Sequence, residues 1–118
     1  LSGSPDLRAR FEREARTISQ LNHPNICTLY DIGVESGVNY LVFEFIAGET
    51  LTDRLLRGPL PVSELIAVAL QIVDALNRAH SAGVIHRDLK PGNLMFTDSG
   101  IKLLDFGLAR PMGLEKIE

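Results

Sequence analysis

Apolar positions in the first part of the chain predict an amphipathic helix over about residues 6–21. These positions recur every three or four residues, the spacing that places side chains on one face of an α-helix. They are Leu7, Phe11, Ala15, Ile18 and Leu21. The preceding S-P-D offers Ser4 as a capping residue and Pro5 as the first helical residue, both favoured at helix starts. The sequence N-H-P at 22–24 is expected to end the helix.

The next apolar runs predict two paired strands. Residues 26–34 and 38–46 are rich in Ile, Val, Leu, Tyr and Phe, and Glu35-Ser36-Gly37 lies between them. Apolar runs joined by a short turn containing Gly are typical of a β-hairpin. Ala47-Gly48 is expected to end the second strand, and a short helix is expected near 51–57, before Gly58-Pro59.

A longer helix is predicted over residues 63–82, with Ser63 as its cap and Gly83 as its C-terminal stop. This helix is apolar almost all round, and such a helix is normally enclosed by other elements. We therefore expect a partner, or further parts of the domain, to cover it. Two short strands, 94–96 and 101–104, follow with a turn between them. The order of elements indicates an α+β fold.

Composition narrows the class of protein. The chain has 118 residues, 45% hydrophobic and 23% charged, which suits one small globular domain. A net charge of −3 gives no basic field, so nucleic acid and anionic membranes are not expected as partners. The longest apolar stretch, 65–76, is too short to span a bilayer. Cys27 is the single cysteine, so an internal disulfide is excluded and a cytoplasmic location is expected.

A polar loop follows the long helix. Its sequence, H-R-D-L-K-P-G-N at 86–93, sets Asp88 and Asn93 five residues apart across a stiff proline and a flexible glycine. A carboxylate held this way can orient a hydroxyl and accept its proton. An amide oxygen is a hard ligand suited to Mg²⁺, and Lys90 could meet phosphate oxygens. These groups suit the transfer of a phosphoryl group.

A second polar position comes after the last predicted strand. Asp105 precedes Phe106-Gly107 and is a second candidate ligand for Mg²⁺. Taken singly, these residues have plainer explanations: an Asp before Gly is usually a turn residue, and a Lys beside Asp is commonly a weak surface pair. The joint pattern H-R-D-L-K-P-x-N, strand, turn, strand, D-F-G is far more specific.

This combination resembles the catalytic core of the eukaryotic-type protein kinases, and the K-P form of the loop resembles their serine/threonine members. The sequence on either side of the loop is similar to that of bacterial members of the family. The resemblance implies an incomplete protein-kinase-like fold, with part of the N-lobe at 1–46 and the first part of the C-lobe at 47–118. It implies Asp88 as catalytic base, Lys90 as the γ-phosphate contact, and Asn93 and Asp105 as Mg²⁺ ligands.

The resemblance also implies how ATP would be bound. Glu14, within F-E-R-E-A, matches the glutamate that pairs with an ATP-binding lysine, and Glu12 competes for this role. Phe43 matches the gatekeeper, and residues 44–46 match the hinge whose backbone bonds adenine, with Glu44 and Ile46 as its contacts. Met95 would lie beneath the adenine ring, although a Met there is equally ordinary core. ATP and Mg²⁺ are the expected cofactors, and a protein Ser/Thr hydroxyl is the expected acceptor.

Three expected motifs are absent from the sequence. No G-x-G-x-x-G precedes the first helix, no lysine lies in the first half of the chain, and no A-P-E follows D-F-G. Because the phosphates would lack their usual cover and paired lysine, we predict little or no kinase activity for the isolated chain. The chain starts with Leu1 rather than Met, which favours a piece of a longer protein.

Three interpretations of function stay open at this point. The first is a fragment of a serine/threonine protein kinase. The second is a truncated kinase-like module that binds a partner through its uncovered helix without catalysis. The third is a small-molecule phosphotransferase of related fold. Arg87 and Phe106-Gly107 argue against the third, because those enzymes typically carry H-G-D and lack D-F-G. The intact polar residues of both loops favour the first over the second.

Overall fold

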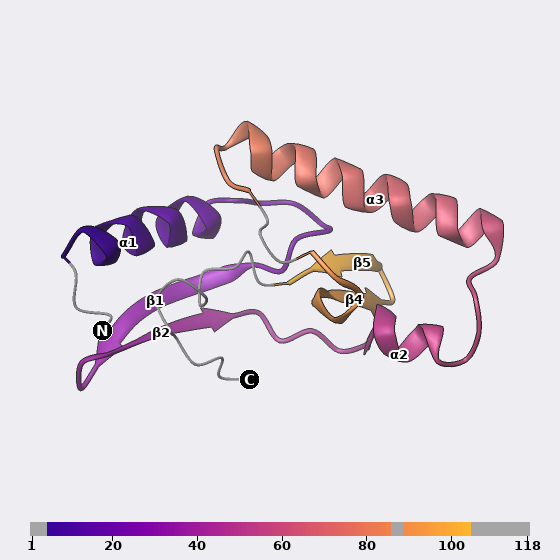
Figure 1. Cartoon of the computed structure of the whole chain (residues 1–118), viewed down its shortest axis with the longest axis horizontal. Helices are drawn as coiled ribbons and strands as arrows, with labels where there is room; N and C mark the ends of the chain where they lie inside the picture. The colour runs from indigo at the N-terminus through magenta and orange to yellow at the C-terminus, as the bar shows by residue number, and fades with distance from the viewer. Residues whose placement is uncertain (1–4, 86–88, 105–118) are drawn as a thin grey trace.

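The fold begins with an amphipathic helix that packs on a β-hairpin. The computed structural model describes residues 5–85 and 89–104 (Figure 1). Helix α1, Pro5–Ser19, buries Phe11, Ala15 and Ile18 on one face, and contacts the first strand of the hairpin. The predicted helix is confirmed, including Pro5 as its first residue; Ser4 lies outside the described residues.

The hairpin is shorter than the sequence predicted. Strand β1, Leu29–Glu35, pairs antiparallel with β2, Val38–Phe43. The turn residues Ser36 and Gly37 both have positive φ, 51° and 79°, as in the two-residue turns whose twist matches a hairpin. Residues 26–28 and 44–46 were expected to extend these strands. They lie outside both strands. The Ile26 and Cys27 amides bond to the carbonyls of His23 and Leu103, while the Glu44 amide bonds to the Thr28 carbonyl.

A second, three-stranded sheet forms the other end of the molecule. Its order is β3 (Glu49–Thr50), β4 (Leu94–Thr97) and β5 (Gly100–Leu103), all antiparallel. Helix α2, Leu51–Leu55, follows β3 and is capped by the Thr50 hydroxyl, which accepts from the Asp53 amide at 3.0 Å. A single 3₁₀ turn, Pro91–Asn93, precedes β4. The second predicted hairpin is therefore confirmed.

The long helix α3, Val62–Ser81, begins before the predicted cap. Ser63 as N-cap was wrong: Pro61 occupies the cap position in an extended conformation, and its carbonyl accepts the Leu65 amide at 2.9 Å. The predicted stop at Gly83 is confirmed. Gly83 has φ of 83°, and its amide donates to the carbonyl of His80 while the Val84 amide donates to that of Ala79. This is the Schellman arrangement, which ends the helix and turns the chain away from its axis.

Helix α3 is covered on one side only by the described residues. Its face towards β5 buries Val68, Ala75 and Ala79. Several large apolar side chains on the helix are more than half exposed: Val62, Leu65, Ile66, Leu70 and Val73. Residues 5–85 and 89–104 leave this side of the helix uncovered, and its covering by a partner or by further parts of the domain stays a prediction. No helix in these residues is both long enough and apolar enough to cross a membrane.

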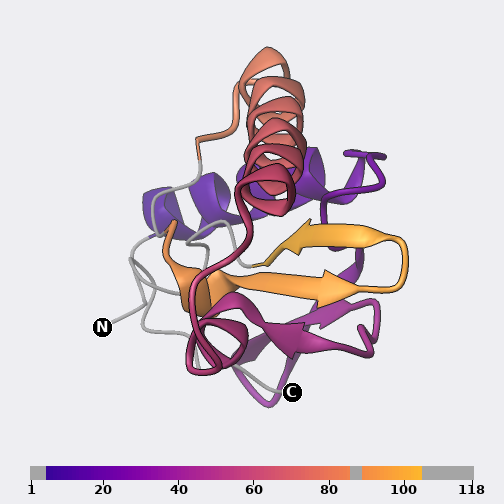
Figure 2. The same ribbon diagram turned by 90° about the vertical axis from the view of Figure 1, so that its right-hand side faces the viewer.

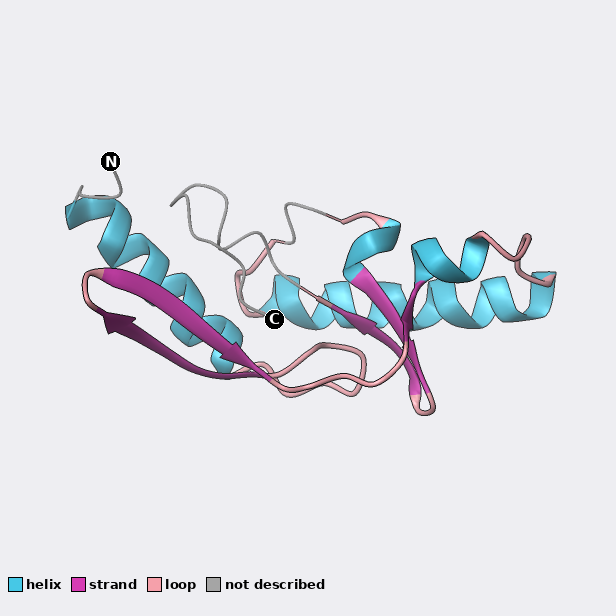
Figure 3. Cartoon of the chain, turned by 90° about the horizontal axis from the view of Figure 1, so that it is seen from below, coloured by secondary structure: helices cyan, strands magenta, loops and turns pink. Residues whose placement is uncertain are grey.

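One segment joins the two ends of the molecule. Figure 2 looks along the molecule from the end that holds β4, β5 and α3. The hairpin lies with α1 at one end, and β4, β5 and α3 lie together at the other (Figure 3). Between them Ile26 bridges Leu103 in parallel, and the Cys27 amide donates to the Leu103 carbonyl at 2.9 Å. Buried residues from both ends, among them Ile18, Leu29 and Leu103, form one hydrophobic cluster. The α+β fold class is confirmed.

Candidate active site

The polar loop ends in a rigid turn that buries one predicted ligand. Lys90 is extended and exposed, and its carbonyl accepts the Asn93 amide at 2.9 Å, closing the 3₁₀ turn Pro91–Asn93. Proline at the first position presets the backbone dihedral that such a turn requires. Asn93 is only 5% exposed. A buried amide side chain is normally held by polar partners, so Asn93 belongs to an ordered site. The predicted base Asp88 lies outside the described residues.

The residue that precedes the second polar position is bonded to the end of the polar loop. The Leu104 amide donates to the Asn93 carbonyl at 2.8 Å. Leu104 immediately precedes the predicted ligand Asp105, which lies outside the described residues. The structure thus joins the end of the polar loop to the residue before D-F-G by a direct backbone hydrogen bond.

The residues predicted to hold adenine come from two places in the chain. Phe43 ends β2 opposite Leu29, Glu44 and Ile46 follow it, and Met95 lies on β4. All four are partly buried, whereas Phe45 between them is 90% exposed. Residues 44–48 connect the hairpin to β3 without regular secondary structure. Their role in binding stays a prediction.

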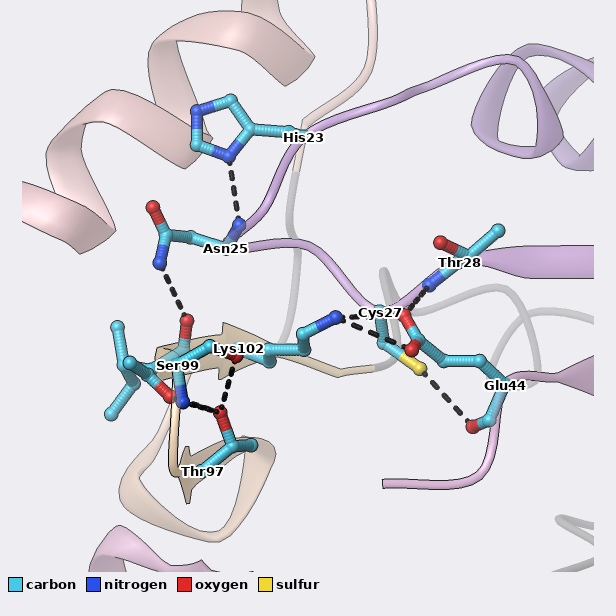
Figure 4. Close-up of polar contacts among 10 residues, drawn as sticks. His23, Asn25, Cys27, Thr28, Glu44, Thr97, Ser99 and Lys102 are labelled. Carbon is cyan, nitrogen blue, oxygen red and sulfur yellow. Dashed lines mark hydrogen bonds and ion pairs between the residues drawn. The ribbon is translucent and has the colours of Figure 1, made fainter. Parts of the chain in front are cut away.

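Glu44 has a dense set of polar contacts (Figure 4). Its carboxylate accepts the Thr28 amide at 2.8 Å and receives the Lys102 ammonium at 3.1 and 3.3 Å. Its own amide donates to the Thr28 carbonyl at 2.9 Å, and its carbonyl lies 3.7 Å from the Cys27 thiol. Partial burial works to raise the pKa of Glu44, but the Thr28 amide and Lys102 together lower it below its ordinary value.

Sequence reasoning missed Lys102. The available signal was its place between Ile101 and Leu103 on a short apolar strand. A lysine on a largely buried strand requires an acidic or polar partner nearby, and here that partner is Glu44.

A polar network that sequence reasoning also missed fixes the position of β5. The Asn25 side-chain amide donates to the Ile101 carbonyl at 2.8 Å and to the Gln71 side-chain oxygen at 3.3 Å. That oxygen also accepts the Ile101 amide at 2.8 Å. His23 Nδ1 accepts the Asn25 amide at 3.0 Å, and its Nε2 lies 2.7 Å from an Asp74 carboxylate oxygen. The loop after α1, read from sequence only as a helix stop, therefore ties α3 to β5.

Glu12 and Glu14, the two candidates on α1 for pairing with an ATP-binding lysine, differ in burial. Glu12 is exposed, and its carboxylate lies 3.6 Å from the Arg16 guanidinium one turn later. Glu14 is partly buried, at the edge of the face that packs on the hairpin. The half-buried position suits a residue with a fixed role better than the solvated one does.

The described residues define the limits of the remaining site. Within residues 5–85 and 89–104, no three His, Cys, Asp or Glu side chains cluster closely enough to hold a metal ion. Asn93 is outside those residue types, and Asp88 and Asp105 are outside that part of the chain. A shallow hollow lies between the segment before β3 and the β4–β5 turn, and none of the predicted site residues lines it. Its lining is Ala47, Gly48, Glu49, Phe96, Thr97 and Asp98.

Two known proteins with similar sequences are named for the same activity. The chain is 43% identical over 102 residues to the serine/threonine-protein kinase PrkC of Bacillus subtilis, covering 85% of the chain and 16% of that protein. It is 39% identical over 118 residues to the serine/threonine-protein kinase PknL of Mycobacterium tuberculosis, covering 98% of the chain and 30% of that protein. The chain therefore spans less than a third of the length of these relatives.

Solved structures give the same family. The kinase domain of Mycobacterium tuberculosis PknI matches with a TM-score of 0.81 at 34% identity, over 92% of this chain and 45% of that one. Rad53 in complex with AMP-PNP matches with a TM-score of 0.78 at 34% identity, over 83% and 28%. The protein kinase domain family matches residues 3–117. The chain therefore belongs to the protein kinase family, and the relatives described above are named as its serine/threonine members.

Proposed function

We propose that the protein containing this chain transfers the γ-phosphate of ATP to serine or threonine hydroxyls of other proteins. The observation that carries the proposal is the 2.8 Å hydrogen bond from the Leu104 amide to the Asn93 carbonyl. It supports a single site built from the polar loop and D-F-G. Phosphoryl transfer needs mainly positioning and neutralisation of charge, and two fixed loops can supply both.

The predicted ligands suit Mg²⁺ by their chemistry. Asn93 contributes a buried amide in a rigid turn, and Asp105 is next to the residue bonded to it. Oxygen donors of this kind are the ones Mg²⁺ takes in proteins. The ion, when bound, would neutralise charge on the phosphates. We assign Asp88 to accept the hydroxyl proton and Lys90 to contact the γ-phosphate.

The nucleotide base would lie between the hinge and β4. Residues 44–46 would bond adenine through the backbone, Phe43 would limit the depth of the cleft, and Met95 would lie beneath the ring. The partial burial of Phe43, Ile46 and Met95 supports this assignment. The similar structure of Rad53 is a complex with AMP-PNP, an ATP analogue. Glu14 would pair with a lysine outside this chain, and its half-buried place on α1 supports that role.

Several broader proposals follow from the same assignment. We place the boundary between N-lobe and C-lobe parts at residues 46 and 47, and we expect the protein to act in the cytoplasm on protein substrates, without nucleic acid. Finding the protein in an extracellular fraction of its host would contradict the location.

A binding module without catalysis is the second candidate. The observation that favours it is the exposed apolar side of α3, including Leu65, Ile66 and Leu70, because exposed patches of this kind mark interaction sites. The two candidates differ in whether phosphate transfer occurs at all.

Radiolabelled ATP distinguishes these candidates. A kinase domain that contains residues 1–118 should label a generic protein substrate, and Asp88→Asn should lower the rate by about a thousandfold or more, as expected when a catalytic base is lost. Asn93→Ala should lower it and make activity demand more Mg²⁺. The isolated 118-residue chain should label nothing measurable. Transfer unaffected by Asp88→Asn would refute the assignment, and strong transfer by the isolated chain would refute the prediction about it.

A further inference from the structure

The ion pair between Lys102 and Glu44 joins β5 to the hinge. The ammonium lies 3.1 and 3.3 Å from the two carboxylate oxygens, and the two side chains are only 17% and 20% exposed (Figure 4). Pairs at exposed surfaces contribute little, because water and salt screen them. This pair is largely withdrawn from water, so breaking it leaves a charge with poor compensation.

Lys102 lies on the face of the sheet that carries Met95. On β5, Ile101 and Leu103 point into the core, so Lys102 points to the opposite face. Lys102 and Met95 are directly opposite each other on β5 and β4, and directly opposed residues of antiparallel strands share a face. The side chain proposed to support the adenine ring and the side chain that grips Glu44 are therefore neighbours.

The other contacts of Glu44 hold its backbone. Its amide and its carboxylate both bond to Thr28, at 2.9 and 2.8 Å. The Lys102 ammonium adds a third contact, to the Glu44 carboxylate. Thr28 precedes Glu44 in the sequence, whereas Lys102 follows it by 58 residues. The carboxylate is thus shared by the segment after α1 and by β5, while the backbone of the same residue begins the hinge.

We infer that Lys102 is a positioning residue for ATP. Through the carboxylate of Glu44 it holds the hinge backbone at a fixed distance from Met95. This inference rests on the proposed function. The same strand ends one residue before Leu104, whose amide bonds to Asn93. Lys102 consequently links the segment proposed to bind the base to the loops proposed to bind the phosphates and metal. It contacts neither nucleotide nor metal itself in this arrangement.

A stabilising role alone would be met by apolar residues at both positions. Replacing a buried ion pair by apolar side chains of similar size is often neutral or favourable for stability. A positioning role predicts a different result. Without Lys102 the hinge would keep its fold, but its distance from Met95 would no longer be fixed. The two roles therefore separate in ligand affinity rather than in melting temperature.

The test uses a kinase domain that contains residues 1–118, with three variants: Lys102→Met, Lys102→Arg and Glu44→Gln. Calorimetry with adenosine reports the base site alone, and steady-state assays give KM for ATP and kcat. Lys102→Met should weaken adenosine binding and raise KM by about tenfold, the loss expected for one charge-assisted contact, with kcat changed by less than about twofold. Lys102→Arg should retain most of the affinity. Glu44→Gln with Lys102→Met should cost no more than the larger single change.

A matched control separates positioning from loss of stability. Val68→Ala removes buried volume from α3 and lowers the melting temperature, and it should leave adenosine affinity unchanged. If Lys102→Met lowers melting temperature without changing adenosine affinity, the pair is structural only and the inference is wrong. If adenosine binds more tightly, the pair restrains the hinge and the inference is also wrong. If the unmodified domain neither binds adenosine nor transfers phosphate, the proposed function fails instead.

Discussion

The side-chain amide of Asn25 donates a hydrogen bond of 2.8 Å to the carbonyl of Ile101, 76 residues further along the chain. Asn25 is itself buried and shares a second acceptor, the Gln71 oxygen, with the Ile101 amide. Both backbone groups of one residue on β5 are thereby held by side chains from outside the sheet. The strand that leads to Asp105 is fixed by the loop after α1 and by α3 together.

Removing Gln71 should destabilise the fold through this network. Gln71→Ala leaves the Ile101 amide and one Asn25 donor without their acceptor, and we expect the free energy of unfolding to fall by about 1–3 kcal/mol. Chemical denaturation monitored by circular dichroism measures it. Asn77→Ala, at an exposed position of the same helix, should change it by less than about 0.5 kcal/mol. Equal effects of the two substitutions would contradict the assignment.

Coupling between Asn25 and Gln71 can be measured separately. Each single substitution to Ala breaks the shared contact, so the double substitution should cost less than the sum of the singles by about 0.5 kcal/mol or more. Strict additivity would mean that the two side chains act independently on β5.

Gly48 should tolerate no side chain. A Cβ built on Gly48 would lie 1.9 Å from the Phe96 carbonyl oxygen on β4, so Gly48→Ala must push the segment before β3 away from the sheet. We expect a loss of about 1–3 kcal/mol, as for overpacked sites. A Cβ on Gly92 meets only the Thr52 hydroxyl at 3.8 Å, so Gly92→Ala is the stability control. Comparable melting temperatures for the two variants would show that the close approach is not needed.

The stability of the chain should fall at acid pH through Glu44. The Thr28 amide and Lys102 lower the pKa of Glu44 in the folded state despite partial burial, so the unfolded chain takes up this proton first as pH falls. The contribution is therefore full above the ordinary Glu pKa of about 4.3 and is lost as pH falls through the lower folded value. Unfolding of the wild type and Glu44→Gln should converge over this range. A difference that is constant from pH 7 to 3 would exclude this origin.

The uncovered side of α3 should cause self-association of the isolated chain. Leu65 and Leu70 are 52% and 66% exposed, and an apolar patch of this kind favours association. Replacing both by Lys should reduce the association seen by sedimentation velocity, with little change in melting temperature. Val68→Lys, at a buried position of the same helix, should instead unfold the chain. An unmodified chain that stays monomeric at high concentration would contradict the prediction.

Local patterns in the sequence predicted the elements well and their contacts poorly. The spacing of Phe11, Ala15 and Ile18, and the glycine at 83, act within one or two turns, so α1 and the end of α3 could be read directly. The strands at 26–34 and 38–46 were predicted too long. Nothing local shows that Ile26 and Cys27 pair with Leu103 instead of continuing the hairpin, because that choice depends on a strand far along the chain.

The candidate site divides in the same way. The resemblance named Asn93, Glu44 and Met95 by their motif positions, and the family assignment is shown by the comparisons. The partner of Glu44 could not be named, because any of several basic residues could have reached it. Only the alternation along β5 decides that Lys102, and not a neighbour, faces the hinge.

The parallel bridge between Ile26 and Leu103 bears on where this polypeptide can be divided. A polypeptide beginning at Ala47 would keep α3 and the three-stranded sheet but lose residues 25–28. The amide and carbonyl of Leu103 would then lack their acceptor and donor, Asn25 and Cys27, and the outer edge of β5 would be open to other chains. Any separately expressed C-terminal half should therefore carry the stretch from His23 to Thr28 with it, supplied in trans as a short peptide if not in cis.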